Sequence, residues 1–270
     1  MMPVGTSSAQ RLVLNIGAAP IALYIEDPSF ADLMRERYGD FVEAQGPACA
    51  EVEVQLAEAQ SGDPDQEMQV VRDGRLWRME RGDLRAEFDS DTNRGVIRQT
   101  ANPYAIDSAL RVIHTLLLSN QGGFLLHAAS AIRNDKAYVF SGVSGAGKTT
   151  IARLAPPDAT LLTDEASYLR PEDGGYFAYG TPFAGELARI GEPAKAPVEK
   201  LLLLAKGPEN RLDRVPTSAA ARLLMRNILF FARDAAAVAR VFNSACDFVA
   251  RVPVYVLTFF PSPEVWNLIG

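Results

Sequence analysis

The chain has 270 residues, of which 48% are hydrophobic and 22% are charged. This composition is typical of an ordinary globular protein, long enough for one large α/β domain or for a catalytic domain with a smaller companion. The chain has no run of 18 apolar residues, and its first ten residues lack the basic and apolar segments of a signal peptide. We therefore expect a cytoplasmic protein without a membrane partner.

Charge is distributed unevenly. Residues 1–122 hold 11 Arg, no Lys and 19 acidic residues, whereas residues 123–270 hold 16 basic and 14 acidic residues. The net charge of about −8 on the front half argues against a nucleic-acid partner there. We interpret the asymmetry as the mark of two structural units, an N-terminal α+β region at 1–122 and a second domain at 123–270. Cys49 and Cys246 are far apart, which favours neither a disulfide framework nor a zinc site.

The N-terminal region shows short strand patterns and two helical patterns, but no motif of chemistry. Apolar spacing predicts helices at 28–38 and 103–118, and His114 lies near the apolar face of the second, where a structural role is expected. A polar turn is predicted at 59–66. Strands are predicted at 12–16, 21–25, 51–56, 68–71, 76–79, 84–88 and 95–99.

A glycine-rich motif dominates the second half. An apolar strand at 138–141 runs into Gly142–Thr149, which fits G-x-x-x-x-G-K-S/T, and a helical segment follows. Small residues in this motif let backbone N–H groups cradle phosphate oxygens, while the lysine reaches the β- and γ-phosphates and the hydroxyl binds Mg²⁺. We therefore predict a nucleotide phosphate site that uses ATP and Mg²⁺. The predicted binding residues are Gly142, Ser144, Gly145, Ala146, Gly147, Lys148, Thr149 and Thr150.

A carboxylate pair follows at short spacing. The strand at 159–163 ends in Asp164-Glu165, and ligands of open α/β sheets bind at such strand ends. Asp164 is the candidate for holding magnesium or accepting a hydroxyl proton. A hairpin between 122–132 and 138–141 would bring His127 towards the glycine turn, although the residues alone favour a core histidine there.

The remaining elements are architectural. Strands are predicted at 198–204 and 254–258, and helices at 217–231, 234–249 and 263–269. Thr217 is expected to cap the first of these helices.

Three stretches together resemble the catalytic core of HPr kinase/phosphorylase, whose fold is shared by phosphoenolpyruvate carboxykinase. They are Leu126–Ser130, Ser141–Thr150 and Leu162–Glu165. The resemblance extends from about Phe124 to the C-terminus and is greatest to HPr-kinase-like proteins that lack the bacterial enzyme's N-terminal half. It implies an α/β nucleotide-binding core with a phosphate loop, to which the N-terminal α+β region is an elaboration.

The resemblance also implies roles. Lys148 and Thr149 match the family's phosphate and metal ligands, Asp164 its general base on a serine hydroxyl, and His127 the histidine beside that acid. Glu165 stands where the family has a second Asp, which leaves its metal role open. A Gly-Ile-Gly-type signature is absent and Tyr179–Glu186 stands in its place, so phosphorylase activity and HPr as the substrate are left open. Glu186 is either a metal ligand or the cap of a following helix.

The sequence therefore predicts an ATP-dependent kinase that transfers the γ-phosphoryl group to a serine-like hydroxyl of a protein or peptide. Three alternatives stay open: a small-molecule kinase on the same fold, a nucleotide-binding regulatory protein without turnover, and an NTPase coupled to partner binding. A carboxykinase is disfavoured because its metal site needs Lys and His ligands, and the chain has only two His. The identity of the acceptor, ATP versus GTP, and whether the chain forms a homo-oligomer are not decided by the sequence.

Overall fold

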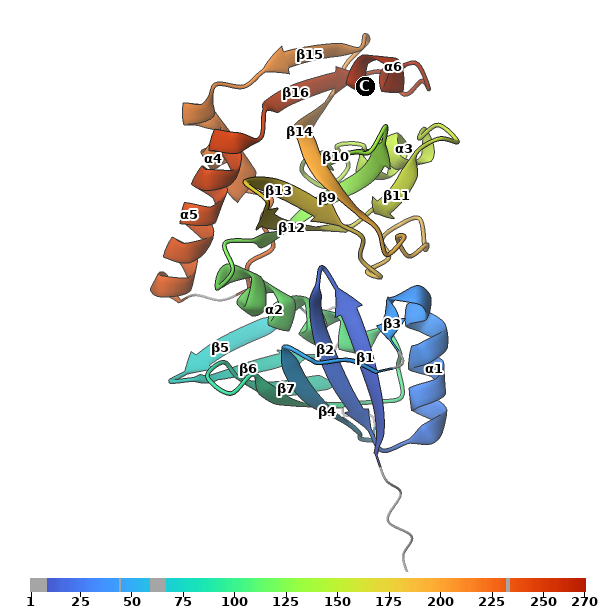
Figure 1. Cartoon of the computed structure of the whole chain (residues 1–270), viewed down its shortest axis with the longest axis vertical. Coiled ribbons are helices and arrows are strands. Elements are labelled where there is room, and N and C mark those ends of the chain that lie inside the picture. The colour runs from blue at the N-terminus through green and yellow to red at the C-terminus, as the bar shows by residue number, and fades with distance from the viewer. Residues whose placement is uncertain (1–8, 44, 59–66, 232–233) are drawn as a thin grey trace, which may run out of the picture. The chain divides into compact units, whose positions relative to one another are not determined.

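The computed structural model describes residues 9–43, 45–58, 67–231 and 234–270, so the predicted turn at 59–66 lies outside the described residues. The chain divides into two compact units, residues 1–113 with 231–234, and residues 114–230 with 235–270. The division falls inside the helix α2 (Ala105–Ser119). Each unit combines helices with an eight-stranded sheet, as the α/β class predicts (Figure 1). The predicted domain boundary at residues 122 and 123 remains a prediction.

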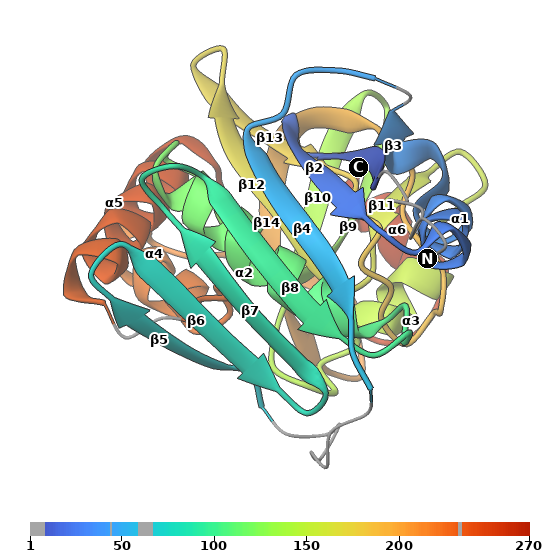
Figure 2. The same ribbon diagram turned by 90° about the horizontal axis from the view of Figure 1, so that it is seen from below.

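The first unit is built on one sheet in the order β3-β1-β2-β4-β8-β7-β6-β5. Figure 2 shows strands β4 to β5 of this order side by side. The elements are β1 (Gln10–Ile16), β2 (Ala19–Ile25), α1 (Pro28–Tyr38), the 3-10 helix η1 (Gly39–Phe41), β3 (Val42–Glu43), β4 (Ala50–Leu56), β5 (Gln69–Asp73), β6 (Leu76–Arg81), β7 (Leu84–Asp89) and β8 (Arg94–Gln99).

Helix α1 connects strands within this sheet. The Asp27 side chain accepts a hydrogen bond from the N–H of Phe30 at 2.7 Å, and Pro28 occupies the first turn, where no N–H partner is needed. Strands β2 and β4 are parallel, so the chain crosses over through α1, whereas β5 to β8 form the antiparallel meander that the turn residues predict. The predicted helix at 28–38 is therefore confirmed.

The second unit contains the glycine-rich motif. Its elements are β9 (Phe124–Arg133), β10 (Lys136–Ser141), α3 (Lys148–Arg153), β11 (Thr160–Thr163), β12 (Ala166–Glu172), β13 (Gly175–Tyr179), β14 (Lys195–Lys206), β15 (Arg211–Arg214), α4 (Thr217–Met225), α5 (Ala235–Arg251), β16 (Val254–Phe259) and α6 (Val265–Ile269). Its sheet runs β10-β9-β12-β13-β14-β16-β15, with β11 on β9. Because β10 also pairs with β14, five of the strands close into a ring.

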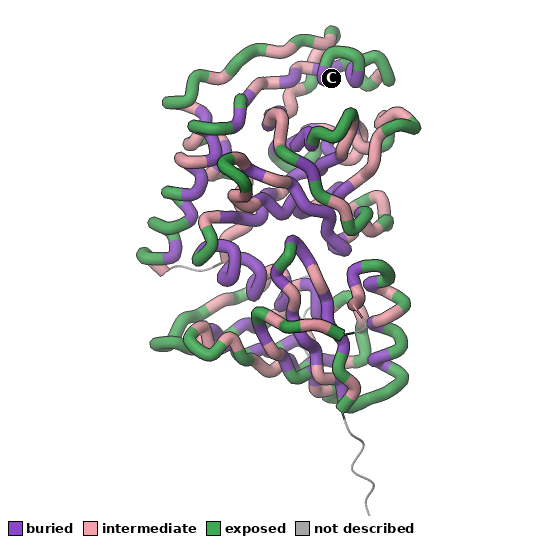
Figure 3. The backbone as a smooth tube through the Cα atoms, in the orientation of Figure 1, coloured by how far each residue is buried: buried purple, intermediate pink, exposed green. Residues whose placement is uncertain are grey.

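Both faces of this sheet are covered. Alternate residues of β10 enter two different cores: Ala137 and Val139 pack with α4 and α5, and Tyr138 and Phe140 pack with α3 and α6. Figure 1 shows the two helix pairs on opposite sides of the sheet. In Figure 3 the strands between them are largely buried, while α5 exposes one side. A strand buried on both faces has a continuous apolar sequence, which explains the apolar run before the motif.

Several predicted elements need correction. The helix predicted at 217–231 ends at Met225, because the next residues pair with β9 instead: Asn227 accepts from the His127 N–H at 2.8 Å, and Leu229 donates to Leu125 at 2.9 Å. Thr217 is not a cap, since Pro216 holds the N-cap position without a side-chain hydrogen bond. Strands β3, β12, β13 and β15 were not predicted. No helix in the described parts of the chain is long and apolar enough to cross a lipid bilayer.

Candidate functional site

The phosphate-loop motif forms the strand, turn and helix that its sequence predicts. Strand β10 ends at Ser141 and α3 begins at Lys148. Between them Gly145 and Gly147 adopt φ of 74° and 111°, which residues with a side chain rarely adopt. A Cβ atom on Gly147 would also lie 2.6 Å from the Phe259 ring, so glycine is required there twice over.

The loop presents several free backbone donors. Among the described residues, no group accepts a hydrogen bond from the N–H of Gly145, Gly147, Lys148 or Thr149. The Ala146 amide, in contrast, is used internally and donates to the Val143 carbonyl at 3.0 Å. Successive unpaired N–H groups at the start of a helix are the donors that phosphate oxygens need.

Lys148 is 7% exposed and lies against the same loop. Its ammonium group donates to the carbonyls of Gly142 at 3.0 Å and Val143 at 3.4 Å. Burial lowers the pKa of Lys148, and the negative charges of Glu165 and Glu186 oppose this shift. An ammonium group at the loop can neutralise the negative charge of phosphate oxygens, or that of nearby carboxylates that would hold a metal ion.

Asp164 lies at the same end of the sheet as the loop. Strands β10 and β11 are both antiparallel to β9, with Ser141 opposite Ala128 and Thr163 opposite Ser130, so their carboxyl ends are neighbours. The Asp164 side chain is buried, however, and both its oxygens accept backbone hydrogen bonds. Oδ1 accepts from the Gly185 N–H and Oδ2 from the Leu187 N–H, each at 2.9 Å.

The segment that supplies those amides, residues 180–194, is here called the Glu186 loop. It contains no helix, so the helix-cap alternative for Glu186 is excluded. A Cβ on Gly185 would lie 2.9 Å from Asp164 Oδ2 and 3.0 Å from Glu165 Oε2. Glycine therefore allows the loop backbone to approach both carboxylates.

Glu186 reaches the phosphate loop. Its Oε2 accepts a hydrogen bond from the Thr149 hydroxyl at 3.0 Å. Among the described residues, no group of three or more His, Cys, Asp or Glu side chains is arranged as a metal site. The hydroxyl and carboxylate that do meet still fit Mg²⁺, which typically takes one or two protein oxygens and completes its shell with phosphate and water.

The second carboxylate of the pair faces His127. His127 Nδ1 lies 3.6 Å from Glu165 Oε1 and 3.2 Å from the Glu165 carbonyl oxygen. The predicted hairpin that positions this histidine is confirmed by the pairing of β9 with β10, and Ser141 donates its hydroxyl to the His127 carbonyl at 3.0 Å. Both side chains are 28% exposed, in contrast to the buried Asp164.

These groups line one cavity of about 260 Å³. Most of the predicted site residues line this cavity. Gly142 and Ala146 do not, and they pack against each other within the loop, where a Cβ on Gly142 would lie 2.8 Å from the Ala146 Cβ. The lining residues are His127, Ser144, Gly145, Gly147, Lys148, Thr149, Thr150, Asp164, Glu165 and Glu186.

The roles of Gly185 and Leu187 were not predicted from the sequence. Gly185 lies in the stretch Tyr179–Glu186 described above and Leu187 follows it, but no local pattern indicates that the backbone amides of Gly185 and Leu187 bind Asp164. His114, predicted to be structural, does not line this cavity. It is fully buried, and its ring makes edge contacts with Tyr168 and Phe183 at centroid distances of 5.6 Å and 6.4 Å.

Comparison with known proteins gives one family. Residues 97–269 match the family model described as SynChlorMet cassette protein ScmC. No curated protein matches the chain. Among solved structures, the Hpr(Ser) kinase/phosphatase from Coxiella burnetii is similar at 12% identity and a TM-score of 0.30, with 54% of this chain and 85% of that chain covered.

Proposed function

We propose that this chain, which belongs to the SynChlorMet cassette protein ScmC family, is an ATP-dependent kinase. The segment that matches the family contains the entire cavity. The acceptor is a serine-like hydroxyl of a protein or peptide. The observation that carries this proposal is the convergence, in one cavity, of free loop amides, a lysine, a hydroxyl–carboxylate pair and a carboxylate–histidine pair. Phosphoryl transfer needs mostly positioning and charge neutralisation, and this set supplies both.

The phosphate loop binds the donor. The N–H groups of Gly145, Gly147, Lys148 and Thr149 point to phosphate oxygens, and the Lys148 ammonium exchanges its loop carbonyls for the β- and γ-oxygens. Thr149 and Glu186 are the proposed metal ligands, and magnesium held there would supply charge neutralisation on those oxygens. The sequence also predicted Asp164 and Glu165 as metal ligands, which their other contacts do not favour.

The proton of the acceptor hydroxyl needs a base. The sequence predicts Asp164 for this role, with His127 polarising it, but both Asp164 oxygens already accept backbone hydrogen bonds. Glu165 is more exposed to the cavity and lies beside His127. We therefore assign proton abstraction to Glu165 with His127, and to Asp164 the positioning of the Glu186 loop.

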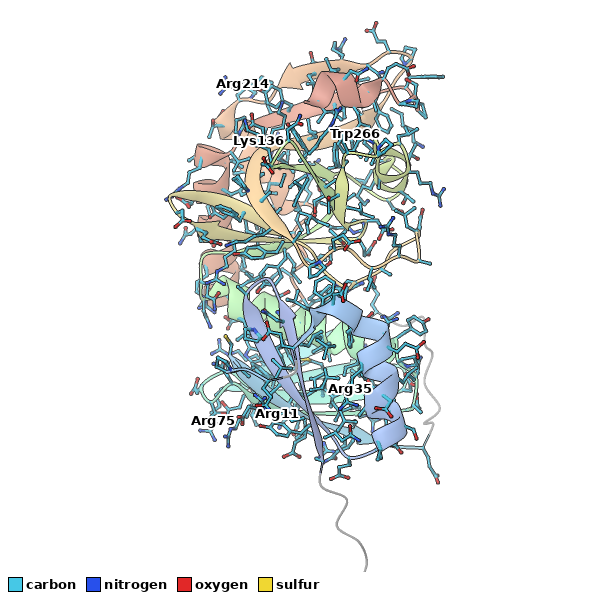
Figure 4. All side chains as sticks on the ribbon, turned by 45° about the vertical axis from the view of Figure 1, so that its right-hand side comes forward. Arg11, Arg35, Arg75, Lys136, Arg214 and Trp266 are labelled. Atoms are coloured by element: carbon cyan, nitrogen blue, oxygen red, sulfur yellow. The ribbon has the colours of Figure 1, made fainter. Side chains whose placement is uncertain are left out.

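The test follows labelled γ-phosphate from Mg-ATP in a mixture of proteins and peptides encoded near this gene. Wild type is compared with Lys148→Ala and with a matched control, Lys136→Ala. Lys136, which is labelled in Figure 4, lies at the opposite end of β10 and pairs with Glu199. We expect label on one acceptor with wild type and the control, and none with Lys148→Ala.

Binding of ATP is measured on the same samples. Nucleotide binding without any labelled acceptor would overturn the kinase assignment in favour of a nucleotide-binding regulatory protein. Release of free phosphate without an acceptor would instead support an NTPase. Label on a small molecule alone would support a small-molecule kinase.

A further inference from the structure

An exposed aromatic side chain lies at the carboxyl edge of the sheet that carries the phosphate loop. Phe260 follows directly after β16 and is 55% exposed. Strands β10, β14 and β16 are parallel neighbours, so the loops after all three emerge at one edge. The phosphate loop is the first of these, and in parallel α/β sheets one ligand spans such adjoining loops.

The segment after β16 is held against the phosphate-loop helix at both ends. At its start the Phe259 ring packs on Gly147, and at its end the Trp266 indole donates to the Ile151 carbonyl of α3 at 3.1 Å. Figure 4 labels Trp266 on α6. Pro261 and Pro263 restrict the backbone between these two anchors. Phe260 is therefore kept at a defined place beside the loop.

Two hydrogen bonds join this segment to the loop after β14. The Gly207 N–H donates to the Phe259 carbonyl at 3.2 Å, and the Phe260 N–H donates to Asn210 Oδ1 at 3.0 Å. Among the described residues, the Asn210 Nδ2 group has no acceptor. The Asn210 side chain, with its free amide donor, is thus bonded to the backbone of the residue that carries the exposed aromatic ring.

The neighbouring strands end at different heights. Ser141, the last residue of β10, pairs with Leu203, whereas β14 continues to Lys206, opposite Phe259. Three further residues of strand extend about 10 Å. Strand β16 therefore continues beyond the end of β10, and Phe260 follows it on the side of the sheet edge from which the phosphate loop emerges.

We propose that Phe260 and Asn210 form the subsite for the base of the nucleotide, with the base stacked on the Phe260 ring and hydrogen-bonded by the Asn210 amide. This inference rests on the proposed function, because it places the base of a nucleotide whose phosphates occupy the loop. Stacking on an aromatic ring is open to any purine, whereas the amide donor requires an acceptor atom on the base edge. Phe260 and Asn210 are thus the residues that would set nucleotide affinity and base preference.

The experiment compares ligands with and without a base. Dissociation constants of Mg-ATP, Mg-GTP and Mg-tripolyphosphate are measured by titration calorimetry for wild type, Phe260→Ala and Phe260→Trp. The matched control is Phe242→Ala, which removes a 48% exposed phenylalanine from α5, on the other face of the sheet. Lys148→Ala serves as the control for the phosphate site.

We expect Phe260→Ala to weaken the tighter-binding nucleotide about 10-fold, which is within the range of base stacking on an aromatic ring, and to leave tripolyphosphate unchanged. Phe260→Trp should retain nucleotide affinity, and Phe242→Ala should match wild type. Equal loss of nucleotide and tripolyphosphate, or no loss of either, would overturn the base subsite while leaving the phosphate loop in place. If wild type binds none of the three ligands, the proposed function fails, and this inference with it.

Discussion

Each unit of the molecule contains a buried aspartate, and the two are satisfied in different ways. In the first unit Asp107 of α2 accepts from the Tyr38 hydroxyl at 2.8 Å and pairs with the Arg37 guanidinium. In the second unit Asp164 accepts from two backbone amides of the Glu186 loop. Burial raises the pKa of Asp107, and the nearby charge of Arg37 opposes that shift.

The difference lies in what surrounds each carboxylate. Asp107 and Tyr38 are buried and the Arg37 side chain is largely buried, and their contacts join α1 to α2. Asp164 instead binds the backbone on either side of Glu186. The Glu186 side chain lines a cavity together with Glu165 and Lys148. In the first unit the charges of Asp107 and Arg37 are paired with each other. In the second unit charged side chains line a cavity, where they are available to a ligand. A buried acid alone therefore does not indicate a site.

The largest expected effect concerns the two acids of the site. Glu165→Gln should lower kcat for phosphoryl transfer by about 10²–10⁴-fold with little change in the KM for Mg-ATP, because it removes a base and keeps the shape. Asp164→Asn should mainly raise that KM, since an amide can accept only one of the two backbone hydrogen bonds and the Glu186 loop is displaced.

Steady-state kinetics on the labelled acceptor separate these outcomes. If Asp164→Asn abolishes kcat at unchanged nucleotide affinity while Glu165→Gln stays active, then Asp164 is the base, as the sequence predicts, and our assignment of the two acids is wrong.

A smaller effect is expected in the first unit. Asp107→Asn should reduce the free energy of unfolding by about 3 kcal/mol, because it leaves the largely buried Arg37 without its counter-charge. Urea denaturation measures this, and Mg-ATP affinity should be unchanged. Asp40→Asn, at an exposed position, is the control and should stay within about 0.5 kcal/mol of wild type. Equal stability of Asp107→Asn and wild type would contradict a structural role for the pair.

The smallest expected effect concerns His114, a buried side chain that has neither the charged partner of Asp107 nor the backbone hydrogen bonds of Asp164. His114 is fully buried, neither ring nitrogen has a hydrogen-bond partner among the described residues, and burial lowers its pKa to about 3. Between pH 6.5 and 3 the unfolded chain binds a proton that the folded chain does not, so acid favours unfolding. His114→Phe should therefore reduce the loss of stability between pH 7 and pH 5 by about 2 kcal/mol.

Urea denaturation of wild type and His114→Phe at the two pH values tests this expectation. His127→Gln is the matched control, since its removal should leave the contribution of His114 in place. An acid-induced loss that is the same in His114→Phe and wild type would show that the folded chain protonates His114.

Local signals were sufficient for much of the fold. The helix at 28–38 was predictable because its cap, its proline and its apolar spacing lie within one short segment. The hairpin of β12 and β13 could have been found from Asp173-Gly174, which adopt positive φ of 48° and 79° in its turn. The end of α4 was not predictable, because Asn227 and Leu229 form backbone hydrogen bonds with β9, about a hundred residues earlier in the chain.

The sequence by itself determined the glycine-rich turn between a strand and a helix, and the kinds of side chain beside it. This was possible because the loop's geometry depends on a contiguous stretch of small residues between a strand and a helix. Only the tertiary structure decided which acid faces the cavity. The backbone donors that engage Asp164 come from residues 21 and 23 positions later, and His127 approaches Glu165 across 38 positions. Such contacts depend on how distant segments pack, and no local pattern records them.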